Sequence, residues 1–166
     1  MTAKNKPAAS SGFTLTRIFA APRALVFAAW TQPAHMKKWS APHGFTVPVS
    51  RGKLKPGGAW TACMVSPQGE KMWLGGAYQE VVPDKKLVFT HAWKGSPETT
   101  LVTVSLSDHP RGTKMIFTQS GFSSAGSQNG HKGGWTECFV RLAEHLAGMA
   151  APKKSPRVSI GKRAVR

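Results

Sequence analysis

The hydrophobic positions along the chain follow two different periods, and each period predicts a type of element. Residues 13–19 (FTLTRIF) alternate between two faces, which is typical of a β-strand. Residues 22–30 begin with a proline and then place apolar side chains at helical spacing. Residues 33–39 have the pattern of a second short helix. The chain therefore opens with a strand followed by two short helices.

A run of six further strands follows, and the turns between them are rich in proline and glycine. The predicted strands are 45–50, 58–65, 71–82, 86–94, 99–107 and 112–120. Spacing this regular, without helical patterns in between, favours an antiparallel meander. The pair Gly75-Gly76 lies inside one strand and predicts a bulge or a sharp bend there.

The last predicted element is a long amphipathic helix over residues 134–147, preceded by a polar loop over residues 121–133. Its apolar stripe consists of Trp135, Cys138, Phe139, Leu142 and Leu146. A helix with one apolar face must cover one face of the sheet. We therefore predict an α+β fold, in which a curved antiparallel sheet of six or seven strands wraps around the C-terminal helix.

Charge is distributed unevenly along the 166 residues. The formal net charge is +16, and residues 150–166 hold six basic residues and no acidic ones. Composition predicts a disordered segment over residues 1–12, one domain over 13–148 and a basic disordered tail over 149–166. Such a tail either increases solubility or binds nucleic acid nonspecifically.

Compartment and membrane association follow from what the sequence does not contain. No apolar run approaches the length of a membrane-spanning helix, and the first residues have no apolar core of a secretory signal. We predict a cytoplasmic protein in which Cys63 and Cys138 are reduced.

No catalytic or metal-binding motif stands out. The histidines and cysteines have no zinc-site spacing, and no phosphate-binding or nucleophile motif is present, so we assign no catalytic residue, metal or cofactor. The acid–base candidates are Glu80, Tyr78 and His91. Glu80 shares a strand face with Tyr78 and is either partly buried or paired with a neighbouring strand. His91 lies on the same face of its predicted strand as Leu87, Phe89 and Trp93. It is therefore either a packed histidine or an acid–base group in a cavity.

Several short motifs, in this order and spacing, resemble one known superfamily. They are Arg17-x-Phe19, Ala21-Pro22-Arg23, Val26-Phe27-x-Ala29-Trp30-Thr31, Trp39, Pro42, Pro56-Gly57-Gly58, Gly76-x-Tyr78-x-Glu80-Val81-x-Pro83, Leu87-Val88-Phe89-Thr90, Trp93, Gly112-Thr113 and Gly134-Trp135. The chain resembles the SRPBCC superfamily, whose fold is called helix-grip or START-like. Within it, the chain is similar to the homologues of the activator of the heat-shock-chaperone ATPase. The resemblance covers about residues 13–147.

This fold implies an apolar space between sheet and helix, and aromatic and methionine side chains suit such a space. The residues that we expect to line it are Trp39, Trp60, Met64, Tyr78, Phe89, His91, Trp93, Met115, Phe117, Phe122, Trp135 and Phe139. Phe122 and the loop after it would gate the mouth.

These observations predict binding of a small hydrophobic or aromatic ligand without defined catalysis. Three alternatives stay open: a cavity-based enzyme of the cyclase or hydrolase kind, a chaperone co-regulator implied by the family, and nucleic-acid binding through the tail.

Overall fold

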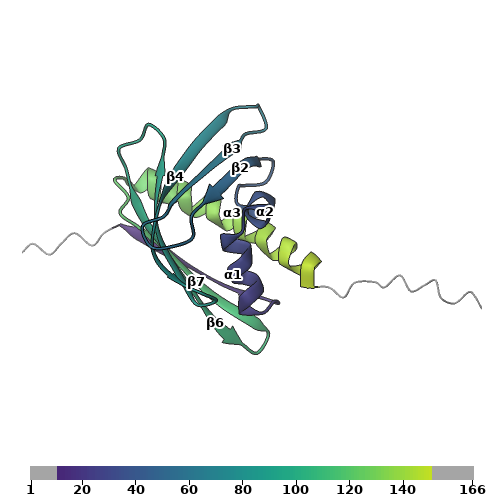
Figure 1. Cartoon of the computed structure of the whole chain (residues 1–166). Helices are drawn as coiled ribbons and strands as arrows, with labels where there is room; N and C mark the ends of the chain where they lie inside the picture. The colour runs from purple at the N-terminus through teal and green to yellow at the C-terminus, as the bar shows by residue number, and fades with distance from the viewer. Residues whose placement is uncertain (1–10, 151–166) are drawn as a thin grey trace, which may run out of the picture.

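The computed structural model describes residues 11–150 and confirms the predicted α+β architecture. A long helix, two short helices and seven strands make up the fold (Figure 1). The strands are β1 Gly12–Phe19, β2 Thr46–Gly52, β3 Ala59–Val65, β4 Lys71–Val82, β5 Lys86–Trp93, β6 Thr100–His109 and β7 Gly112–Ser120. The helices are α1 Arg23–Thr31, α2 Pro33–Trp39 and α3 Ala125–Ala150.

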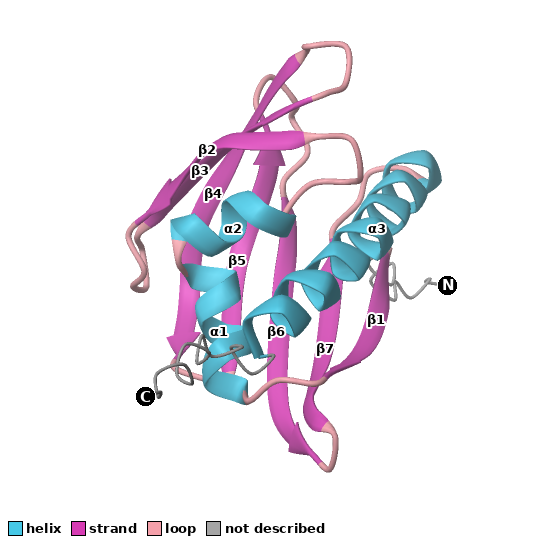
Figure 2. Ribbon diagram, turned by 90° about the vertical axis from the view of Figure 1, so that its right-hand side faces the viewer, coloured by secondary structure: helices cyan, strands magenta, loops and turns pink. Residues whose placement is uncertain are grey.

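All neighbouring strands are antiparallel, in the order β1-β7-β6-β5-β4-β3-β2. The chain therefore runs as a meander from β2 to β7, and β1 closes the far edge beside β7. The three helices lie on one face of the curved sheet, with α3 running across it (Figure 2). This is the helix-grip arrangement that the resemblance implies.

The glycine pair in β4 marks a close approach of backbones. A Cβ on Gly75 would lie 2.6 Å from the carbonyl oxygen of Trp60, and one on Gly76 would collide with the carbonyl oxygen of Thr90. The register shift of β4 against β5 falls later, between Tyr78 and Glu80. Gly75 and Gly76 themselves pair in regular register with Thr61 and Trp60, so no bulge forms at the glycines, and the irregularity lies farther along the same strand.

Helix α3 begins at Ala125 rather than at residue 134, so the predicted polar loop over 121–133 is wrong for most of its length. Local glycine content disfavours a helix here, but capping and tertiary contacts outweigh it. The Ser124 hydroxyl accepts the Ser127 N–H at 3.0 Å, which is the geometry of an N-cap. The Glu98 carboxylate, from the β5–β6 connection, accepts the Ser123 N–H at 2.6 Å and the Ser127 hydroxyl at 2.7 Å.

The main core is aromatic and lies between the C-terminal half of α3, helix α1 and strands β1, β6 and β7. The Trp30 ring contacts the rings of Trp39 and Phe117, with centroids 4.8 Å and 6.0 Å apart. Phe139 of α3 packs on Phe117 at 5.1 Å. These side chains are almost fully buried, so this half of the space between sheet and helix is solid.

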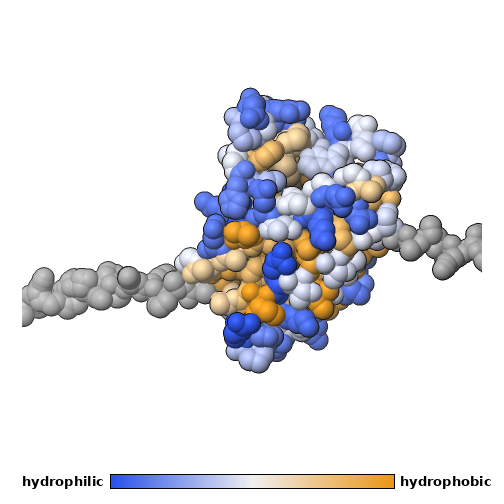
Figure 3. Space-filling view, turned by 180° about the vertical axis from the view of Figure 1, so that it is seen from behind, coloured by the Kyte–Doolittle hydropathy of each residue, from blue (hydrophilic) through white to orange (hydrophobic). Residues whose placement is uncertain are grey.

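Residues 1–10 and 151–166, which make up nearly all of the predicted N-terminal segment and basic tail, lie outside the described residues. Among residues 11–150, no helix is long and apolar enough to cross a membrane. The face seen in Figure 3 mixes hydrophobic and hydrophilic side chains, and exposed large apolar residues are scattered over different elements.

Candidate functional site

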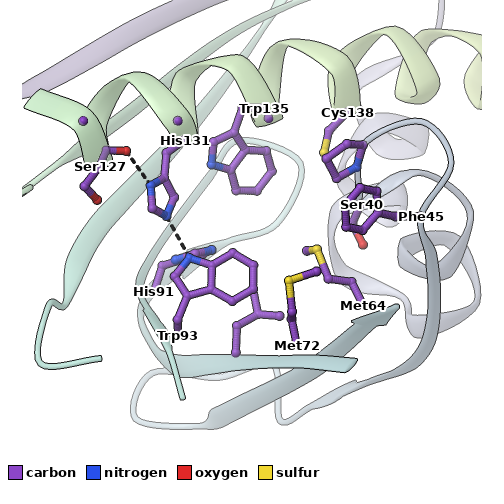
Figure 4. A pocket seen from close by; sticks show the side chains of 15 residues that line it. Ser40, Phe45, Met64, Met72, His91, Trp93, Ser127, His131, Trp135 and Cys138 are labelled. Atoms are coloured by element: carbon purple, nitrogen blue, oxygen red, sulfur yellow. Dashed lines mark hydrogen bonds between the residues drawn. The ribbon is translucent and has the colours of Figure 1, made fainter. Parts of the chain in front are cut away.

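The other half of the space between sheet and helix is hollow. A cavity of about 360 Å³ lies between the N-terminal half of α3 and strands β3, β4 and β5 (Figure 4). Its lining residues are Ser40, Pro42, Phe45, Met64, Met72, Leu74, His91, Trp93, Gly126, Ser127, Gly130, His131, Gly134, Trp135 and Cys138. A smaller space of about 50 Å³ adjoins it, and the residues that line both are Ser40, Met64, Leu74, His91 and Trp135.

The cavity exists because helix α3 presents small residues to it. Gly126, Gly130 and Gly134 are spaced four apart and therefore lie on one helix face. A Cβ added to Gly130 or Gly134 would meet no atom within 4 Å. Farther along the helix the face changes to Phe139 and Leu142, which fill the corresponding space.

A hydrogen-bonded chain anchors the aromatic wall at the start of α3. The Trp93 indole N–H donates to Nε2 of His131 at 2.9 Å, and Nδ1 of His131 lies 2.8 Å from the carbonyl oxygen of Ser127 (Figure 4). Because an indole N–H can only donate, Nε2 of His131 is the acceptor, and its hydrogen is on Nδ1, which donates to the Ser127 carbonyl. Both polar atoms of His131 are thus committed, and the Trp93 ring is held in place.

A second chain fixes Trp135, whose ring borders both the cavity and the solid core. Its indole N–H donates to Oε1 of the fully buried Gln119 at 2.8 Å. Nε2 of Gln119 donates to the hydroxyl of Thr100 at 2.9 Å, and that hydroxyl donates to the His91 carbonyl at 3.1 Å. Every member of this buried chain therefore has a partner.

His91 differs from these residues because its ring has no such partner. It is 5% exposed and lines both spaces, and its side chain makes no hydrogen bond with residues 11–150. Burial, reinforced by the nearby His131, lowers the pKa of His91 to about 4, while its own carbonyl and Glu98 oppose this shift more weakly. At neutral pH the ring is an uncharged imidazole facing an apolar space.

The other titratable groups around the cavity are poorly suited to chemistry. Burial raises the pKa of the Cys138 thiol to about 12, so it is not a nucleophilic thiolate at neutral pH. Burial also raises the pKa of the Tyr78 hydroxyl. Within residues 11–150, no three histidine, cysteine or carboxylate side chains come together as a metal site.

Seven of the twelve expected lining residues lie at the two spaces. Met64, His91, Trp93 and Trp135 line the larger one, and Trp60, Tyr78 and Phe89 line the smaller one. The other five lie elsewhere in the protein core: Trp39, Met115, Phe117, Phe122 and Phe139. Phe122 stacks on Phe13 at 5.7 Å and is outside both sets of lining residues, and the segment expected to be a loop after it is helical from Ala125 onward.

Glu80 does not enter the cavity. Its side chain is 47% exposed and pairs with Lys86, with Nζ and Oε1 3.3 Å apart. The register shift between Tyr78 and Glu80 explains this, since it reverses the alternation, leaves Tyr78 facing inward and turns Glu80 outward. Of the two interpretations of Glu80, the cross-strand pair is the one observed.

The sequence reasoning missed the small and polar wall supplied by α3. Gly126, Ser127, Gly130 and His131 line the cavity but were assigned to a loop. Their signal was the four-residue spacing that joins Gly126, Gly130 and Gly134 to Cys138. This spacing extends the helix face toward the N-terminus, but glycines give no hydrophobic periodicity from which a helix could be predicted.

The seven-stranded sheet gripping one long helix, with a cavity between them, defines a helix-grip protein. The family model described as "Activator of Hsp90 ATPase homolog 1-like protein" matches residues 20–147, and the chain belongs to this family. No curated protein gives a significant sequence match.

Solved structures of bacterial proteins share the fold. A protein from Chromobacterium violaceum is 26% identical, with a TM-score of 0.77 over 81% of this chain and 96% of its own. One from Nitrosomonas europaea is 25% identical, with a TM-score of 0.74 over 85% and 97%. The AHSA1 protein of Silicibacter pomeroyi is 23% identical, with a TM-score of 0.76 over 84% and 99%, and this likeness concerns the fold alone.

Proposed function

We propose that this protein binds a small hydrophobic or aromatic molecule in the cavity between helix α3 and strands β3 to β5. The observation that carries the proposal is the cavity itself, about 360 Å³ in volume and walled by indole, phenyl and thioether groups. This volume lies within the range of small-molecule sites, and apolar walls release water when such a molecule enters.

The rigidity of the walls supports binding rather than collapse. The indole rings of Trp93 and Trp135 are held by hydrogen bonds to His131 and Gln119, so they cannot easily turn inward to fill the space. A preformed site avoids the cost of ordering side chains when the ligand binds.

The alternative with an observation of its own is a cavity-based enzyme, because His91 is a buried imidazole without a partner. A general acid or base normally works with a second oriented group. The described cavity lining contains no carboxylate, and the only other histidine, His131, has both nitrogens committed. Simple binding therefore accounts for more of the site.

Native mass spectrometry of freshly purified protein, beside a denatured control, tests the proposal. We expect a discrete noncovalent adduct that disappears on denaturation, or, for protein purified bare, shifts of the cavity-lining amides in NMR titrations with small aromatic compounds. Amide shifts confined to the outer surface, with no adduct, would contradict ligand binding in the cavity.

A further inference from the structure

Among the nitrogen- and oxygen-bearing side chains that line the larger space, His91 alone has no hydrogen-bond partner within residues 11–150. The other polar side chains of this lining already have hydrogen-bond partners within the protein. The Trp93 indole donates to His131, and the Trp135 indole donates to Gln119. The hydroxyls of Ser40 and Ser127 donate to the Met36 carbonyl and to Glu98, at 2.6 Å and 2.7 Å.

His91 lies at the junction of the two spaces, so a ligand in either one can reach it. Its ring is surrounded by aromatic groups, with ring centroids 5.8 Å from Trp60, 5.9 Å from Trp93 and 6.2 Å from Trp135. Within residues 11–150, the only sealed side-chain nitrogen or oxygen without a partner is Nε1 of Trp30. The ring nitrogens of His91 are therefore not walled off by protein.

No counter-ion for a charged ligand faces this space. Neither set of lining residues includes an aspartate, glutamate, lysine or arginine. A carboxylate or ammonium group would lose its hydration without gaining an opposite charge. The uncharged imidazole offers one donor and one acceptor instead, which match a hydroxyl or a carbonyl group.

We propose that His91 determines the specificity of the cavity, selecting an uncharged aromatic molecule that carries one hydroxyl or carbonyl group and hydrogen-bonds to its ring. The proposal rests on the proposed function and names the class of ligand for the same site. The apolar body of the ligand lies against Trp93 and Trp135, and its polar group satisfies His91. A plain hydrocarbon leaves the imidazole unpaired, and an acid has to be buried as an anion.

The test compares three probes of nearly equal shape: naphthalene, 2-naphthol and 2-naphthoate. Amide NMR titration of the full chain gives each dissociation constant. One hydrogen bond to a buried group contributes about 1 kcal/mol, so we expect 2-naphthol to bind about five- to ten-fold more tightly than naphthalene. We expect 2-naphthoate to bind most weakly of the three.

His91→Leu should remove the advantage of 2-naphthol and leave naphthalene binding nearly unchanged. The matched control is His109→Leu, because His109 lies at the end of β6, bonded to the Arg111 N–H and outside both sets of lining residues. The control should keep the full preference. Equal binding of naphthalene and 2-naphthol to the wild-type cavity would overturn the role of His91 while leaving the proposed function intact.

A measurement on the wild-type protein covers the case in which His91→Leu does not fold. The ¹⁵N resonances of the His91 ring should shift with 2-naphthol and remain nearly constant with naphthalene at the same occupancy. An unchanged ring resonance at saturating 2-naphthol contradicts the specificity role. Absence of cavity amide shifts with all three probes contradicts the proposed function itself.

Discussion

Helix α3 packs against the sheet in two different ways along its length. Its C-terminal half presents Phe139, Leu142 and Leu146 to α1, β1 and β7 and closes a dense aromatic core. Its N-terminal half presents Gly126, Gly130 and Gly134 to β3, β4 and β5 and leaves a cavity. The size of the side chains on one helix face therefore decides where the space between sheet and helix is densely packed and where it is hollow.

The largest difference should appear when a side chain is removed from each half. Phe139→Ala should lower the free energy of unfolding by about 3–5 kcal/mol, because its ring is buried among four other aromatic rings. Met72→Ala at the cavity wall should cost less than about 1 kcal/mol, since its side chain already borders open space. Urea denaturation measures both, and equal costs would remove the distinction between the halves.

The buried imidazole of His91 should make the free energy of unfolding fall in mild acid. The pKa of His91 is lowered from 6.5 to about 4, so the unfolded chain takes up this proton first as the pH falls. Stability should decline by about 3 kcal/mol between these two values and show no further loss from this group below them. His91→Leu should lack that part of the decline. His145, whose pKa is also lowered, titrates in both proteins, so the difference isolates His91.

Substituting two tryptophans compares the stability contributed by a hydrogen bond at the border of the core with that of one at the cavity wall. Trp135→Phe leaves Oε1 of the fully buried Gln119 without a donor, which should cost about 1–3 kcal/mol of unfolding free energy. Trp93→Phe removes the same kind of bond from His131, but that ring is only half-buried and water can replace the donor. A cost for Trp93→Phe equal to that of Trp135→Phe would show that the cavity wall is as dry as the core.

Adding a methyl group to the glycine face should stabilise the protein slightly. Gly134→Ala should raise the free energy of unfolding by about 0.5–1 kcal/mol, because alanine favours the helix and its Cβ meets no atom within 4 Å. Gly76→Ala is the opposing control, since its Cβ would collide with the Thr90 carbonyl and should destabilise the sheet. Loss of stability in Gly134→Ala would mean that the helix face is closed rather than open.

The smallest effect concerns the start of α3. Hydrogen bonds from the Ser123 N–H and from the Ser127 and Ser123 hydroxyls lower the pKa of Glu98 from 4.5. A carboxylate with a lowered pKa stabilises the fold above 4.5, and this contribution is lost as the pH falls through the folded-state pKa. Glu98→Gln should therefore cost less than about 1 kcal/mol at neutral pH, and its denaturation midpoint should approach that of the wild type in acid.

Sequence periodicity predicted most of the elements but not all of the site. The strands were predicted within a few residues, because alternation and proline–glycine turns are local signals. Trp93, His91 and Met64 were expected at the cavity from strand alternation together with the family resemblance, and they line it. Glu80 was left between two interpretations, since the register shift that turns it outward is set by pairing with β5.

The α+β class, the meander, the family and an inward face rich in aromatic residues could all be predicted from the sequence, because these depend on periodicity and short motifs. Only the tertiary structure decided which aromatic residues became core and which became cavity wall. It also decided that a glycine-rich segment is helical. Both outcomes depend on contacts between distant segments. Glu98 and Ser124 hold the first turn of α3 through hydrogen bonds. The glycine face of α3 then leaves a cavity, whereas farther along the helix Phe139 fills the corresponding space.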